Sequence, residues 1–217
     1  MKKILLGTAM LLSLAAFNQA SAQKGFSLSV KGTPQFSWLS NSDDNDNSNY
    51  SKKTTFNTNF GIGGAYNFTD NLGVGLDVLY SLQGQKYNLG GTEFHQKVDY
   101  LKLPLMFLYN TNPSKPVSFI AKLGPQLSIR TSAKLDNKDG DELADNKDAF
   151  KSTTFGGVAV AGVQFRLDKS LYLTTAARYD YDFTNAENKD IAGYTPGRAD
   201  THNMTAGLEV GLKYLLK

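Results

Sequence analysis

A chain of 217 residues suits one large domain or two small ones, and its mean hydropathy of −0.34 argues against a bundle of membrane helices. The absence of Cys excludes a disulfide scaffold, a thiolate zinc site and a cysteine nucleophile, and a formal net charge of +3 gives no sign of nucleic-acid binding. Twenty Gly, 11 Tyr and 13 Phe instead indicate strands and turns.

The first 22 residues have the three parts of a secretory signal peptide. Lys2 and Lys3 precede an apolar stretch over residues 4–16, and Ala20-Ser21-Ala22 is a small-residue cleavage site. The apolar stretch is too short to cross a membrane comfortably. We therefore expect residues 1–22 to be a signal peptide and residues 23–217 to form one domain beyond the inner membrane.

Eight segments of the remaining chain alternate apolar and polar residues with the two-residue period of a β-strand. Most exceed the roughly 5–6 residues of a typical globular strand. The segments lie near residues 26–38, 54–68, 72–83, 101–110, 117–130, 153–166, 171–183 and 201–214.

The connections between these segments alternate between short and long. The short ones lie at residues 68–71, 110–116 and 167–170, and the long polar ones at residues 40–52, 86–94, 134–150 and 184–200. This alternation predicts an up-and-down meander. It is typical of transmembrane β-barrels, which have short periplasmic turns and longer extracellular loops.

Alternation by itself does not distinguish a membrane barrel from a soluble ligand-binding barrel, because the two differ only in which face is apolar. Aromatic residues near the strand ends favour the membrane, where rings lie at the two lipid–water interfaces. The sequence thus predicts an all-β, eight-stranded antiparallel up-and-down transmembrane β-barrel in the outer membrane, with a soluble barrel as the alternative. The predicted interface aromatics are Trp38, Tyr66, Phe68, Tyr109, Tyr179, Tyr181 and Tyr214.

Charged residues on the polar face predict a closed lumen. Eight strands leave room for side chains but not for a water channel, and buried charges need partners. We expect Glu209 to pair with Arg178, Lys31 or both, and Asp77 to pair with Lys102 or a nearby lysine. Pro104 and Pro125 interrupt two of the strands, and we expect a β-bulge at each because proline cannot donate to the ladder.

The run Tyr100-Leu101-Lys102-Leu103-Pro104-Leu105-Met106, followed by Gly124-Pro125-Gln126, resembles motifs of the PorT-like outer-membrane β-barrel family of Bacteroidetes-type bacteria. The resemblance covers essentially all of residues 23–217. It implies an outer-membrane barrel, and some members of that family are tied to protein export. The end of the chain, Tyr214 to Lys217, departs from the terminal aromatic residue that many outer-membrane barrels carry.

Candidate chemistry is sparse. His95 with Asp99 and His202 with Asp200 fall near the predicted extracellular rim, but no nucleophile signature accompanies them, so we expect no catalytic residues and no enzyme. The acidic stretches near residues 43–47 and 136–148 lack the spacing of a calcium loop, so no metal or other cofactor is expected.

These observations predict an outer-membrane protein with a structural or interaction role, whose loops present a binding surface. A secretion accessory or a narrow pore is the alternative, and a rim-site enzyme is the weakest hypothesis. The expected partners are outer-membrane lipid, lipopolysaccharide and a protein bound at the loops, without nucleic acid, and the barrel is expected to be a monomer. Tyr50, Tyr87 and Tyr194 are candidate loop contacts.

Overall fold

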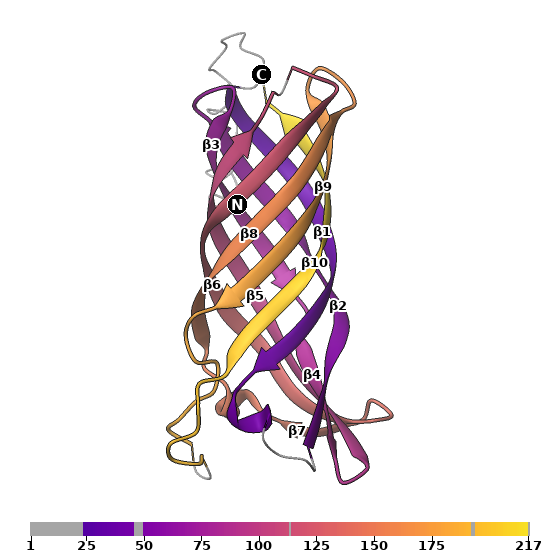
Figure 1. Cartoon of the computed structure of the whole chain (residues 1–217), viewed down its shortest axis with the longest axis vertical. Coiled ribbons are helices and arrows are strands. Elements are labelled where there is room, and N and C mark those ends of the chain that lie inside the picture. Colours follow the sequence, from indigo (N-terminus) through magenta and orange to yellow (C-terminus); the bar gives the residue numbers. More distant parts are fainter. Residues whose placement is uncertain (1–23, 46–49, 113, 192–193, 217) are drawn as a thin grey trace, which may run out of the picture.

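The computed structural model describes residues 24–45, 50–112, 114–191 and 194–216, so the predicted signal peptide lies outside the described residues. Figure 1 shows strands wound into one tall cylinder, with every paired strand antiparallel to its neighbour. Within the described ranges, no helix is long and apolar enough to cross a membrane. The elements are β1 (Gly25–Ser40), η2 (Asp43–Asn45), β2 (Tyr50–Asn67), β3 (Leu72–Ser81), β4 (Gly84–Leu89), β5 (Thr92–Asn110), β6 (Val117–Asn137), β7 (Glu142–Asp145), η3 (Lys147–Ala149), β8 (Thr153–Arg166), β9 (Leu171–Asp182) and β10 (His202–Leu215).

Eight strands form the ring, as the sequence predicts. β3 and β4 are two parts of one strand, because both pair with β2 on one side and with β5 on the other. The short β7 pairs with β6 beyond the ring. The first and last strands close the barrel through a continuous register from Ser27 with Leu215 to Ser40 with His202.

The two ends of the barrel differ in their connections. The turns after β2, β5 and β8 lie at one end, which we call the turn end, together with the C-terminus (Figure 1). The longer connections lie at the other end, which we call the loop end.

Three of the four expected long loops are partly strand, and those expectations were wrong. Residues 50–52 of the first already belong to β2. Residues 86–94 form the tip of a hairpin between β4 and β5, where Gly90 and Gly91 have φ angles of 59° and 92° and make the tight turn. Residues 134–150 include the end of β6 and all of β7. Their polar side chains suit strands that continue past a membrane, because water can then reach both faces.

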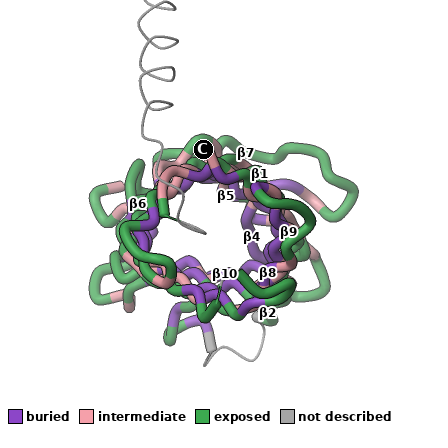
Figure 2. Tube along the Cα trace, turned by 90° about the horizontal axis from the view of Figure 1, so that it is seen from above, coloured by how far each residue is buried: buried purple, intermediate pink, exposed green. Residues whose placement is uncertain are grey.

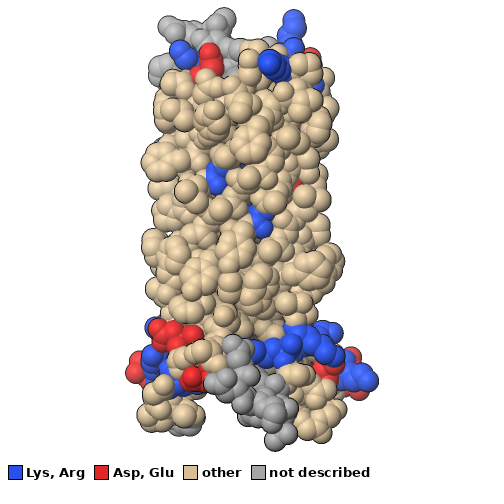
Figure 3. Space-filling view, in the orientation of Figure 1, with Lys and Arg blue, Asp and Glu red and all other residues tan. Residues whose placement is uncertain are grey.

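The two faces of the barrel wall have opposite chemistry. Figure 2 shows a single ring of strands around one central axis. In β3, for example, the apolar Leu72, Val74, Leu76 and Val78 are exposed whereas Asp77 and Ser81 are buried. Figure 3 shows a wide band of the exterior with almost no Lys, Arg, Asp or Glu atoms, between charged rims at both ends. Such an exterior suits lipid, and it overturns the soluble-barrel alternative.

The prolines do not form bulges, which corrects the expectation for Pro104 and Pro125. The register between β5 and β6 is the same on both sides of this region, with Pro104 opposite Gln126 and Phe107 opposite Leu123. The register shift between these strands lies instead at Asp99 and Tyr100. A proline can thus omit its hydrogen bond without an inserted residue, because the neighbouring pairs hold the strands together.

Candidate functional site

Charged side chains from six strands meet inside the barrel, and we call this group the charged layer. β9 contributes two members, Arg178 and Asp180, and they lie next to single residues of the other strands. The other members are Lys31 of β1, Asp77 of β3, Lys102 of β5, Lys122 of β6 and Glu209 of β10.

Arg178 joins both carboxylates on its side of the layer. Its Nη1 donates to Glu209 Oε2 at 3.0 Å, and its Nη2 donates to Asp180 Oδ1 at 2.9 Å. Lys122 Nζ donates to Glu209 Oε1 at 2.6 Å, and Lys102 Nζ lies 3.4 Å from Asp180 Oδ2. These side chains come from opposite walls of the barrel, so we interpret the layer as filling the lumen.

The predicted pair of Glu209 and Arg178 is present, and Asp77 pairs with a nearby lysine other than Lys102, which the expectation also allowed. Lys31 Nζ contacts Asp77 Oδ2 at 2.7 Å rather than Glu209, and Lys102 contacts Asp180 rather than Asp77. Gly63 of β2 explains the first pairing. A Cβ atom at Gly63 would lie 2.1 Å from Asp77 Oδ1, so only a glycine there lets the Asp77 carboxylate reach across β2 toward β1.

Six of the seven predicted interface aromatics lie in two zones, and Tyr179 is the exception. Tyr66, Phe68, Tyr109 and Tyr214 are at the turn end, each more than 40% exposed. Trp38 and Tyr181 are half-buried toward the loop end, and Tyr179 directly follows Arg178 of the charged layer.

Three loop-end connections are tied to one another, and we call residues 41–44, 146–151 and 184–201 the loop-end cap, apart from residues 192–193. Arg198 is its centre, since it contacts Glu187 Oε2 at 3.0 Å and Asp44 Oδ1 at 2.8 Å. The Glu187 carboxylate, followed by Asp44, raises the pKa of Arg198 above its usual value, so this cation stays charged. Asn41 Nδ2 adds a hydrogen bond of 2.7 Å to Thr201 Oγ1.

A small apolar core lies beneath the loop-end cap. It joins strand residues of β1, β5 and β6 to two cap residues, Phe150 and Ala186, and it includes Tyr100 with no exposed surface. The Tyr100 hydroxyl accepts a hydrogen bond from Asn203 Nδ2 at 3.0 Å. Burial of these side chains fixes the cap over the end of the lumen. The buried members are Leu39, Val98, Tyr100, Ala133, Phe150 and Ala186.

The loop-end cap encloses one side of a pocket of about 350 Å³, which we call the loop-end pocket. Its lining combines rings and aliphatic groups with amides and the Arg198–Glu187 ion pair. Tyr87 and Tyr194, which the sequence suggested as contacts, both line it, whereas the side chain of Tyr50 lies outside the described residues. The lining includes Leu39, Tyr87, Gln96, Asn146, Phe150, Glu187, Asn188, Ile191, Tyr194 and Arg198.

The two histidines have other partners than the expected aspartates. His95 Nε2 lies 3.3 Å from Glu93 Oε1, and its hydrogen bond lowers the pKa of Glu93. His202 stacks on Tyr181 and its Nδ1 lies 3.0 Å from the Asp182 carbonyl oxygen.

The acidic stretches form ion pairs and turns. Asp44 pairs with Arg198, and Asp136 pairs with Lys97. Asn137 Oδ1 accepts hydrogen bonds from the backbone N–H groups of Asp139 and Asp141, which makes a local turn. Among the described residues, no group of three His, Cys, Asp or Glu side chains could hold a metal ion.

Sequence reasoning missed the loop-end cap and pocket. Their apolar members, such as Phe150 and Ile191, stand inside long polar segments. That contrast was the available signal, because an isolated large apolar residue in a polar loop often packs against another segment.

The solved structures most similar to this chain include several outer-membrane barrels. Neisserial surface protein A is 18% identical, with 91% of this chain and 99% of that chain covered and a TM-score of 0.52, so the two share a fold. OprG of Pseudomonas aeruginosa is 14% identical (88% and 96% covered, TM-score 0.48), and a major outer membrane protein of Thermus thermophilus is 18% identical (87% and 98% covered, TM-score 0.47).

No curated protein matches the chain in sequence. The family model for the outer membrane protein beta-barrel domain, however, matches residues 4–213, which is most of the chain. Its barrel architecture and lipid-suited exterior agree with that match. The chain therefore belongs to the outer membrane protein beta-barrel domain family and is a protein of the outer membrane.

Proposed function

We propose that this outer-membrane barrel is an interaction protein that binds a partner protein outside the cell through its loop end. The observation that carries the proposal is the loop-end pocket, which the ordered cap builds from residues far apart in sequence. Short turns face the periplasm and longer loops face outward in barrels of this kind, so the pocket opens outside the cell.

The lining of the loop-end pocket supports protein recognition. Tyr and Arg are among the residue types that contribute most binding energy at protein interfaces, and Tyr87, Tyr194 and Arg198 all line the pocket. Glu187 and Asp44 already hold the Arg198 side chain in place, so this side chain loses little conformational entropy when a partner binds. A partner would insert an apolar or aromatic side chain between these rings.

Photo-crosslinking on intact cells tests this proposal. A photoreactive residue at position 194 should trap one discrete protein species, whereas the same residue at the exposed position 189 should not. With the trapped protein purified, Tyr194→Ala should weaken binding by roughly tenfold or more, and Lys189→Ala should leave it unchanged. Equal trapping at both positions, or no trapping at either, would contradict a pocket-mediated interaction.

A secretion accessory is the second candidate, and the resemblance to the PorT-like family favours it. In the structure, that motif supplies Tyr100 to the apolar core and Lys102 to the charged layer. A strain that lacks the chain should then lose a set of exported proteins from its culture medium. Unchanged export, together with crosslinking at position 194, would favour the interaction role.

We further propose that lipopolysaccharide phosphates contact lysines just beyond the apolar band. Lys53 lies opposite Lys86 in the β2–β4 pair, and Lys97 lies opposite Lys134 in the β5–β6 pair. Figure 3 shows Lys and Arg atoms gathered at this border.

We propose a monomer without enzymatic activity, since His95 and His202 each have partners unrelated to any nucleophile.

A further inference from the structure

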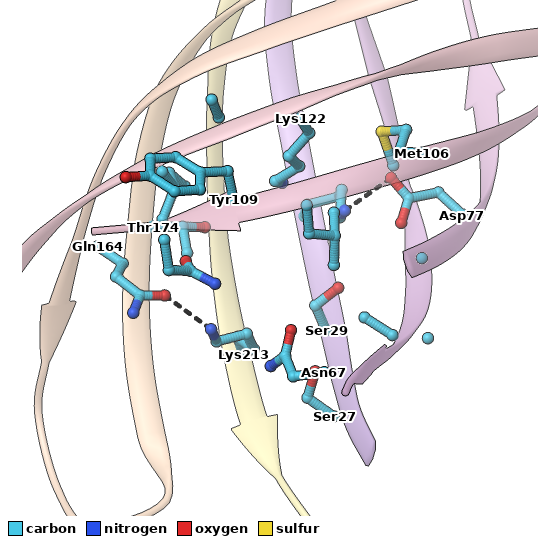
Figure 4. Close-up of a pocket in the computed structure, with 18 residues that line it drawn as sticks. Ser27, Ser29, Asn67, Asp77, Met106, Tyr109, Lys122, Gln164, Thr174 and Lys213 are labelled. Carbon is cyan, nitrogen blue, oxygen red and sulfur yellow. Dashed lines mark hydrogen bonds and ion pairs between the residues drawn. The ribbon is translucent and has the colours of Figure 1, made fainter. Parts of the chain in front are cut away.

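A cavity of about 60 Å³ lies in the lumen between the charged layer and the turn end. We call it the turn-end cavity. Figure 4 shows Lys213, Gln164, Asn67, Ser27 and Ser29 gathered around it, with a hydrogen bond between the first two. The cavity would hold roughly four to six water-sized groups, since each needs about 10–15 Å³.

The walls of the turn-end cavity carry excess positive charge. Three lysines, Lys31, Lys122 and Lys213, line it together with one carboxylate, Asp77. Lys31 is paired with Asp77, and Lys122 is paired with Glu209 of the charged layer. Within the described part of the chain, no carboxylate lies at ion-pair distance from Lys213.

The contacts of Lys213 are neutral ones. Its Nζ donates to Gln164 Oε1 at 2.7 Å and lies 4.8 Å from the centre of the Tyr172 ring. Lys213 is partly buried, and a charge held largely away from water with only neutral partners is costly. An anion bound beside Lys213 would therefore be stabilising.

Two buried polar atoms of the residues that line this cavity have no hydrogen-bond partner among the described residues. Gln164 is 1% exposed, and its Nε2 donates to no described atom. Lys213 fixes the orientation of this amide, because a flipped amide would turn its NH₂ group toward the ammonium. Asn67 is 2% exposed, and its Oδ1 likewise accepts from no described atom.

We propose that the turn-end cavity binds one small inorganic anion, held by Lys213 Nζ and Gln164 Nε2. Its size admits chloride and also bicarbonate or hydrogen phosphate, whose O–H group could donate to Asn67 Oδ1. The anion supplies the negative charge that the protein itself does not place beside Lys213. This site is independent of the loop-end pocket and lies on the other side of the charged layer.

Unfolding of the purified full chain, folded in detergent, tests the proposal. The transition temperature is the temperature at which the fast-migrating band of the folded protein disappears from a gel. It is measured in chloride, bicarbonate or phosphate and compared with the value in gluconate at the same ionic strength. At least one inorganic anion should raise it saturably, by about 5 °C at roughly 100 times its Kd. The three anions distinguish a halide site from an oxyanion site.

Three variants locate the effect. Lys213→Met should abolish the anion-dependent rise, and Lys169→Met, which changes an exposed lysine at the turn end, should keep it. Gln164→Glu should also abolish it while raising the transition temperature without added anion, because the new carboxylate would itself pair with Lys213.

Gln164→Glu keeps the proposal testable if Lys213→Met fails to fold. If none of the three inorganic anions raises the transition temperature saturably, the proposed site is wrong. An undiminished rise in Gln164→Glu would overturn it as well.

Discussion

At the scale of single residues, the lumen shows how buried charges are tolerated in a membrane barrel. Lys31 and Asp77 are almost fully buried and contact each other at 2.7 Å. Such a pair adds little net stability, because its attraction mostly offsets the loss of hydration, but an unpaired member is costly. The same pair therefore predicts opposite outcomes for single and double substitutions.

We expect Lys31→Met or Asp77→Leu alone to destabilise the folded barrel by about 3–5 kcal/mol, and the double variant to be close to neutral. Urea unfolding in lipid vesicles measures the three free energies. The exposed pair of Lys189 and Asp200 is the matched control, where substitutions to Ala should change stability by about 1 kcal/mol or less. Additive losses at Lys31 and Asp77 would show that the two side chains are not coupled.

At the scale of elements, the strands are longer than a membrane requires. β6 has 21 residues, about twice the roughly 9–11 that cross a bilayer as a tilted strand. Its outer part carries β7 and contributes Ala133 to the apolar core beneath the loop-end cap. The strands thus build both the membrane wall and the framework of the external site.

Close strand approach predicts different effects for two glycines of β2. A Cβ at Gly61 would lie 2.0 Å from the Val78 carbonyl oxygen, whereas the nearest atom to a Cβ at Gly64 is Leu28 Cδ2 at 4.0 Å. Gly61→Ala should therefore force β2 and β3 apart and reduce the folded fraction severalfold. Gly64→Ala should leave it unchanged or slightly raised.

Gel mobility of unheated samples reports the folded fraction of these two variants. If Gly61→Ala and Gly64→Ala give the same folded fraction, β2 and β3 can move apart at Gly61 without loss of stability.

At the scale of the whole molecule, the barrel is a wall around a filled interior. The charged layer joins opposite walls, and the loop-end cap covers the lumen beyond it. On the turn-end side of the layer, the interior holds the turn-end cavity of about 60 Å³. Function at this scale is expected at the two ends rather than along an axial path.

We accordingly expect no stable conductance steps from the purified barrel in planar lipid bilayers, because the charged layer blocks the axis. A general porin inserted in the same bilayers serves as the positive control. Reproducible steps from the barrel, retained after removal of the loop-end cap, would show that ions pass the charged layer.

The sequence by itself determined the barrel, because a strand that separates lipid from a polar interior must alternate at every second residue. All eight barrel strands, the closing pair of β1 with β10 and the inward Glu209–Arg178 pair follow from that constraint. Local patterning also placed Tyr66 and Tyr109 at one end of the wall.

Only the tertiary structure decided the contacts that cross the barrel or join its loops. Asp77 meets Lys31 because Gly63 leaves space between them, and Arg198 joins Asp44 to Glu187 because the cap folds over the loop end. Strand alternation says which face a side chain occupies but not how far it reaches or which opposite residue it meets. The loop-end pocket and the turn-end cavity both depend on that reach, so neither could be predicted from spacing along the chain.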